Sequence, residues 1–82
     1  MSEDWIWSEH MEKRVLKRKL SRELVESVVN SPDEVVAAEQ GRLIYQKVIG
    51  DKLCRVVVEG DTLVTAYLTS RIKKYLKGAQ KP

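Results

Sequence analysis

The feature that most restricts the fold of this chain is a change in hydrophobic period near Pro32. Apolar residues before this proline recur at helical spacing, whereas four short segments rich in β-branched residues follow it. These segments are EVVAAE (34–39), RLIYQKVI (42–49), LCRVVVE (53–59) and TLVTAYL (62–68). The connections between them are too short for crossover helices, so each strand must run antiparallel to the next. The pattern therefore predicts a four-stranded antiparallel meander with tight turns.

Two helices are predicted before the meander and one after it. Ser8 can cap a helix over residues 9–19, which carries Glu9 in its first turn and basic residues in its last. Ser21 can cap a second helix, which the Asn30-Ser31-Pro32 sequence stops. A short terminal helix is indicated by an apolar face made of Ile72, Tyr75 and Leu76.

Together these elements predict an α+β protein with a single domain over residues 1–82. We expect a core over residues 6–77 and a frayed tail over 78–82. The two N-terminal helices must lay their apolar stripes on one face of the sheet, which leaves the other face open. On the first helix, that stripe is predicted to contain Met11, Val15 and Leu16.

Strand alternation also predicts which side chains share a face of the sheet. In the last strand, Leu63, Thr65 and Tyr67 should point one way, with Val64, Ala66 and Leu68 pointing the other. This places two hydroxyl groups on one face. Trp5 and Trp7 are expected to belong to a short extended arm that packs over the core.

The composition excludes several classes of protein. A chain with one cysteine and one histidine can form neither an internal disulfide nor a Cys/His zinc site, and we expect no metal and no cofactor. No apolar run approaches the roughly 20 residues needed to cross a bilayer, so we expect no membrane partner. The N-terminal MSEDWIWSEH is acidic, unlike a secretion signal, which favours a cytoplasmic location.

The charge is small overall but unevenly distributed. The net charge is +3, yet six of the fifteen basic residues fall between Lys13 and Arg22. Five more fall in the last twelve residues, from Arg71 onward. A chain with so modest a net charge can still present a strongly basic face, which is the electrostatic footprint of a nucleic-acid binder.

Within the first basic cluster, His10, Arg14 and Arg18 are spaced four apart. On a helix they form one column about 12 Å long. Arginine matches phosphate oxygens with its planar fork, and a histidine can act as a base or a hydrogen-bond partner. The alternative is a solvated basic face paired with Glu9 and Glu12, which is the more common role of such a face.

The order of these residues and strands resembles a known family. The segment HMEKRVLKRKLS, a proline-terminated helix, and the strands containing IYQK, RVVVE and VTAY are similar to the family DUF4258, over about Ile6 to Tyr67. That family is grouped with small RelE- and BrnT-like nucleases of the barnase–colicin–RelE type. One departure is Lys19, which stands where the family usually has a glycine before the aliphatic-Ser pair.

The resemblance implies a RelE-like fold and a metal-independent RNA-cleaving or RNA-binding function. The residues implied as the catalytic site are His10, Arg14, Arg18, Thr65 and Tyr67. His10 would act as acid or base and the two arginines would hold phosphate, while Tyr67 or Lys47 would have to supply a second proton. The resemblance also implies a toxin-like role with an antitoxin protein as partner. Further candidates for contact with RNA are Lys47, Arg42, Arg71 and Lys74.

Two other functions remain open at this point. The chain could be a non-catalytic nucleic-acid-binding module that uses the same basic column and the basic C-terminal segment. It could instead be a protein-interaction domain that uses the open sheet face or an edge strand, for which residues 34–39 are the best candidate. The sequence alone does not separate these alternatives from an endoribonuclease.

Overall fold

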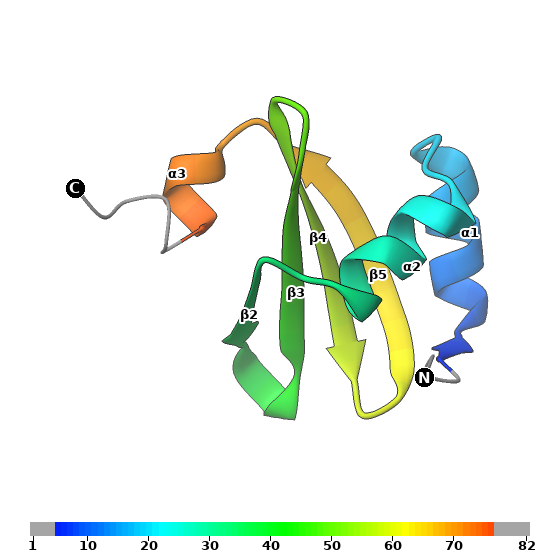
Figure 1. Cartoon of the computed structure of the whole chain (residues 1–82). Coiled ribbons are helices and arrows are strands. Elements are labelled where there is room, and N and C mark those ends of the chain that lie inside the picture. Colours follow the sequence, from blue (N-terminus) through cyan, green and yellow to red (C-terminus); the bar gives the residue numbers. More distant parts are fainter. Residues whose placement is uncertain (1–4, 77–82) are drawn as a thin grey trace.

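The computed structural model describes residues 5–76 as an α+β fold with one sheet between helices (Figure 1). The helices are α1 (Glu9–Lys17), α2 (Arg22–Asn30) and α3 (Ile72–Tyr75), with a one-turn 3-10 helix η1 (Glu39–Gly41). The strands are β1 (Ile6–Trp7), β2 (Glu34–Ala37), β3 (Leu43–Ile49), β4 (Lys52–Glu59) and β5 (Thr62–Thr69). The predicted tail, residues 78–82, lies outside the described residues. No helix within residues 5–76 has the length and apolar character needed to cross a bilayer.

The sheet has five strands in the order β1-β5-β4-β3-β2. Strands β2 to β5 form the predicted antiparallel meander. The prediction of four strands is wrong in one respect, because β1 adds to β5 in parallel, with Ile6 beside Thr62 and Trp7 beside Leu63. The backbone N–H of Ile6 also donates to the carbonyl of Asp61 at 2.9 Å. The sheet is therefore mixed.

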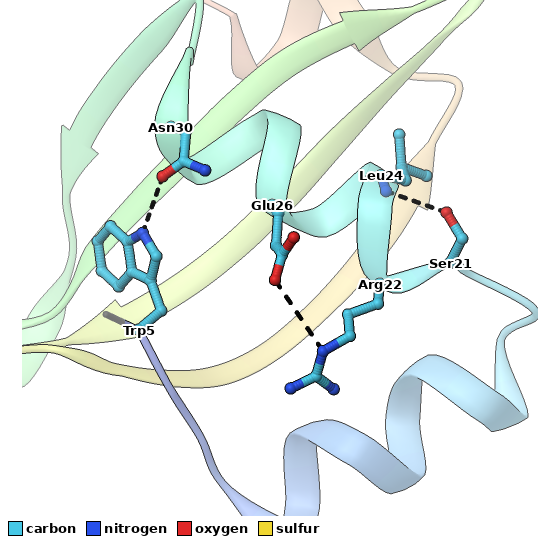
Figure 2. Close-up of polar contacts among 6 residues, drawn as sticks. All are labelled: Trp5, Ser21, Arg22, Leu24, Glu26 and Asn30. Atoms are coloured by element: carbon cyan, nitrogen blue, oxygen red, sulfur yellow. Dashed lines mark hydrogen bonds and ion pairs between the residues drawn. The ribbon is translucent and has the colours of Figure 1, made fainter. Parts of the chain in front are cut away.

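The arm that precedes α1 packs as expected. The Trp5 indole donates from Nε1 to Oδ1 of Asn30 at 3.1 Å, at the end of α2 (Figure 2). Its ring also meets Tyr45 edge-on, with centroids 5.7 Å apart. Both Trp5 and Trp7 pack against the core cluster. The arm thus ties the start of the chain to the helix-covered face of the sheet.

Serine caps start both N-terminal helices. The Ser8 hydroxyl accepts from the backbone N–H of Met11 at 3.0 Å and donates to the carbonyl of Leu63 at 2.9 Å. The Ser21 hydroxyl accepts from the backbone N–H of Leu24 at 3.0 Å (Figure 2). Ser8 therefore both begins α1 and anchors it to β5.

The two faces of the sheet are covered differently. We call the face under α1 and α2 the helix face, and the opposite one the α3 face (Figure 1). The core lies on the helix face, where Met11 and Val15 of α1 and three valines of α2 meet apolar strand residues. Leu16 does not join them and is 80% exposed, because it lies on the solvent side of α1, so that part of the prediction is wrong. The α3 face is not fully open, since α3 lies against it.

A β-bulge changes the predicted faces of β5. Val58 pairs with Leu63 but Val57 pairs with Thr65, so Val64 is an extra residue. Leu63 and Ala66 therefore both point into the core and are both fully buried. The prediction that Leu63 shares a face with Thr65 and Tyr67 is wrong, because the bulge reverses the alternation between them.

The first hairpin is longer than predicted. The predicted strand segments 34–39 and 42–49 leave only Gln40 and Gly41 between them, whereas β2 ends at Ala37 and β3 begins at Leu43. Gln40 and Gly41 both have positive φ within η1. The other two hairpins close with two residues each, Gly50-Asp51 and Gly60-Asp61.

Helix α1 ends two residues earlier than predicted, and Lys19 is the reason. Lys19 has φ of 58°, in the left-handed region. Its N–H donates to the carbonyl of Leu16, and the N–H of Leu20 donates to the carbonyl of Val15 at 2.9 Å. This pair of bonds is a Schellman motif, which normally has glycine at this position. The turn therefore forms with lysine where the resemblance led us to expect glycine.

We expect Lys19→Gly to stabilise the protein by about 1 kcal/mol, because a side chain in the left-handed region is strained and glycine is not. Urea denaturation of the two proteins measures the difference. Lys13→Gly is the control: it removes an exposed lysine from the middle of α1 and should destabilise the protein by about 1 kcal/mol. A loss of stability in both variants would contradict the proposed strain at Lys19.

Candidate functional site

The basic column predicted on α1 is present. His10 and Arg14 are one turn apart, and Nε of Arg14 donates to Nε2 of His10 at 3.1 Å. The bond requires an unprotonated Nε2 on the imidazole. His10 is exposed and Arg14 is half-buried, so the pair can be reached from solvent. The helix places Arg18 one further turn along the same side.

Arg18 connects this column to the edge of the sheet. Its Nη1 donates to the carbonyl of Ala66 at 2.7 Å. That carbonyl lies on the outer edge of β5, beyond Leu63, where pairing with β1 ends. The guanidinium carbon of Arg18 is also 6.0 Å from the centre of the Tyr67 ring. Arg18 therefore reaches around the edge of the sheet from the helix face toward a residue of the α3 face.

We define the α1–β5 surface as His10, Arg14, Arg18, the edge carbonyl of Ala66 and Tyr67. The structure brings Arg18 and Tyr67 together, as the predicted site requires. It does not bring His10 to the strand residues: within residues 5–76, no hydrogen bond or ring contact joins His10 to Thr65 or Tyr67. Along α1, His10 is about 12 Å from Arg18.

A polar network that sequence reasoning missed lies beside Tyr67 on the α3 face. Arg55 of β4 donates from Nη1 to the Tyr67 hydroxyl in a short hydrogen bond, and from Nε to Oε1 of Gln46 at 2.6 Å. Gln46 of β3 in turn donates from Nε2 to Glu34 at 3.0 Å and to the carbonyl of Tyr75 at 3.2 Å. The network runs across four strands of the sheet, from β5 to β2, and also reaches α3.

Both central members of this network are buried. Gln46 is fully buried and Arg55 is 8% exposed. The sequence held a signal for this, because arginine interrupts an otherwise apolar strand, LCRVVVE, and glutamine occupies a similar place in LIYQKVI. In the sheet these two residues are direct partners in the register of β3 and β4. The two interruptions are visible in the sequence, but the register that pairs them is not.

The four further candidates for RNA contact do not gather around the α1–β5 surface. Lys47 points to the helix face and donates from Nζ to the carbonyl of Ser31 at 2.9 Å. Arg42 lies 3.4 Å from Glu59, an ion-pair contact without hydrogen-bond geometry. Arg71 precedes α3 and Lys74 lies within it.

Strand directions explain this scatter. Strands β3 and β5 both run antiparallel to β4, so the start of β3 and the end of β5 lie at opposite ends of the sheet. Arg42 is at the first of these ends and Arg71 at the second. An open hollow of about 460 Å³ next to Arg42 is lined also by Ala38, Glu39, Gln40, Ile44 and Val57.

The lone cysteine is a core residue. Cys54 is fully buried among the apolar residues of the helix face. Burial raises the pKa of the Cys54 thiol from 9.0 to about 11. The thiol is therefore protonated at neutral pH and is not a nucleophile of the candidate site.

The fold and the site define a small α+β protein whose basic helix joins an aromatic residue at the edge of a mixed sheet. The family model described as "Domain of unknown function (DUF4258)" matches residues 7–68, which is more than half of the chain. The chain therefore belongs to this family. Neither the curated proteins nor the solved structures contained a match.

Proposed function

We propose that this protein binds single-stranded RNA along the α1–β5 surface. The observation that carries the proposal is the position of Arg18, which links the basic column of α1 to the Tyr67 ring at the sheet edge. Cations that track a phosphate backbone beside an aromatic ring on which a base can stack are the usual parts of a single-strand binding surface. The choice of RNA rests on the resemblance to RelE-like nucleases.

The roles within this surface follow from their chemistry. Arg14 and Arg18 would hold successive phosphates, since each presents a guanidinium on the same side of α1. Tyr67 would stack on a base or contact a sugar. His10 would accept a hydrogen bond through Nε2, which at present accepts one from Arg14. The antitoxin protein that the resemblance to RelE-like toxins implies would cover the same surface.

Metal-independent RNA cleavage is the second candidate, and the His10–Arg14 contact favours it. A histidine with an unprotonated Nε2 can take a proton from a 2′-hydroxyl, and the adjacent guanidinium can stabilise the charge that develops on phosphorus-bound oxygens. A second proton donor would have to come from another residue, and Tyr67 lies at the Arg18 end of the column. Binding therefore has more geometric support than catalysis.

Fluorescence anisotropy with a labelled, mixed-sequence 12-nucleotide RNA tests the binding proposal. We expect the affinity of the wild type to fall steeply with salt, and the double variant Arg14→Gln/Arg18→Gln to reduce the slope of log K against log salt by about 1.4, or 0.7 for each lost contact. The matched control is Lys13→Gln/Lys17→Gln, which removes the same charge with the same spacing from other sides of α1. Equal changes in both double variants would refute binding at the α1–β5 surface.

The cleavage candidate is tested with the same RNA, end-labelled, in EDTA between pH 5 and 9. Products with a 2′,3′-cyclic phosphate from the wild type but not from His10→Ala would support a ribonuclease with His10 in its site. An intact substrate at every pH would reject a free-standing ribonuclease and would leave the binding proposal to the salt titration.

A further inference from the structure

Arg55 is a buried cation whose described partners are all uncharged. It is 8% exposed, and its hydrogen bonds go to the Gln46 amide and the Tyr67 hydroxyl. Within residues 5–76, no carboxylate lies within ion-pair distance of its guanidinium, and the carboxylate of Glu34 contacts Gln46. A buried charge without a counter-charge is costly, and proteins usually pair such a group with an anion.

The Arg55 guanidinium also has N–H groups that make no hydrogen bond within residues 5–76. Arginine has five N–H groups, and two of those on Arg55 are used by Gln46 and Tyr67. One face of the guanidinium stacks on the Tyr75 ring, 4.0 Å from its centre. Such stacking fixes the plane of the group and leaves its remaining N–H groups directed along that plane. The unused N–H groups of Arg55 are therefore already oriented to bind an anion.

A second cation lies close by. The Tyr67 ring has the Arg55 guanidinium 5.7 Å from its centre and the Arg18 guanidinium 6.0 Å from its centre. Two positive charges therefore flank one phenol at the edge of the sheet. The low-dielectric surroundings of the buried Arg55 strengthen its field, and the exposed Arg18 adds a second, more screened charge, so the pair favours an anion beside the Tyr67 ring.

Helix α3 covers this site. It lies on the side of the sheet opposite α1 and α2 (Figure 1). The Tyr75 ring rests on Arg55, and the Tyr75 carbonyl accepts from Gln46 at 3.2 Å. Leu76, the next residue along the chain, is also buried. These contacts exclude water from one side of the guanidinium.

We propose that Arg55, together with Tyr67, forms a site for a phosphate-type oxyanion on the α3 face. The ligand class is a phosphate carrying at least two free oxygens, either as inorganic phosphate or as part of a nucleic-acid backbone. Only the second source rests on the proposed function. The Arg55 fork would bind two oxygens, and Arg18 would supply the second charge from across Tyr67.

The direct test is NMR of the arginine Nε–Hε resonances while inorganic phosphate is added at constant ionic strength, with sodium chloride as the balancing salt. Loss of one resonance in Arg55→Lys assigns Arg55. We expect a saturable shift of that resonance with phosphate, and no comparable shift of Arg42, the control arginine at the far end of the α3 face. A shift that never saturates, or that is equal for both arginines, would overturn the site.

A second measurement covers the case in which Arg55→Lys does not fold. Phosphate at low millimolar concentration should raise the Tm of the wild type relative to chloride at equal ionic strength, and the rise should saturate, because it binds a site of the folded state. The general stabilising effect of phosphate as a salt grows with concentration and does not saturate. The Arg18→Gln variant leaves the buried network in place. In this variant phosphate should still raise the Tm, and the affinity for inorganic phosphate should fall no more than about tenfold. No effect of phosphate on the wild type would reject the proposal even if no Arg55 variant can be studied.

The source of the phosphate is distinguished by titrating the 12-nucleotide RNA under the same conditions. If RNA moves the Arg55 resonance and phosphate competes with it, the site belongs to the RNA-binding surface. If phosphate moves it and RNA does not, the site takes a small phosphate and the oxyanion proposal stands without the RNA proposal. If neither moves it, the oxyanion site is rejected, whatever the salt titration of RNA affinity shows.

Discussion

Replacing Gln46 by leucine is expected to lower the free energy of unfolding by about 3 kcal/mol, measured by urea denaturation. Gln46 is fully buried, accepts a hydrogen bond from Arg55 and donates one to the Tyr75 carbonyl. Leucine fills a similar volume but leaves the Arg55 Nε–H and that carbonyl without partners. A cost of this size is more than half of the stability expected for a domain this small, about 5 kcal/mol.

A double-mutant cycle separates the lost partners from the change in packing. Arg55→Met removes the charged group that donates a hydrogen bond to Gln46. The double variant Gln46→Leu/Arg55→Met should therefore lose less free energy of unfolding than the sum of the two single variants, by about 1 kcal/mol or more. Additive costs would show that the two side chains are energetically independent. Near-UV circular dichroism reports in parallel whether Tyr75 keeps its place over the sheet.

The second large effect is expected at Met11. This side chain is fully buried where α1 packs on the sheet, and Met11→Ala should cost about 3 kcal/mol through lost burial and the cavity that remains. Thermal or urea denaturation measures the loss. The backbone N–H of Met11 keeps its bond to the Ser8 hydroxyl in the variant, so the helix cap is not changed.

Leu16→Ala is the matched control on the same helix. Leu16 is 80% exposed, so its truncation should change the stability by less than about 0.5 kcal/mol. Together the two variants test which side of α1 faces the core. A large loss at Leu16 with little change at Met11 would mean that α1 is rotated from the orientation described.

The parts of the fold that could be predicted from sequence are those fixed by local signals. Both N-terminal helices start at the predicted serine caps, and α2 stops before Pro32, because capping and proline act within a few residues. Strand β1 could not be predicted, since two residues are too few to show alternation and their pairing depends on Asp61 and Thr62, far along the chain.

The candidate site likewise contains features that local sequence signals fix and features that depend on the rest of the sheet. The His10, Arg14 and Arg18 column depends only on helical spacing, and it formed. The face that Thr65 and Tyr67 share depends on a bulge at Val64, which has no sequence marker such as glycine. The pairing of Arg55 with Gln46 depends on the register of β3 and β4, which arises from packing over the whole sheet.

The bond between Arg18 and the Ala66 carbonyl has a consequence for self-association. An uncovered sheet edge offers its carbonyl and amide groups to any extended chain, and such edges seed aggregation. On β5 one of those carbonyls is already occupied by a charged side chain from α1. A second chain that added to this edge would have to displace a charge-assisted hydrogen bond, so we expect this bond to disfavour strand pairing between separate copies of the protein.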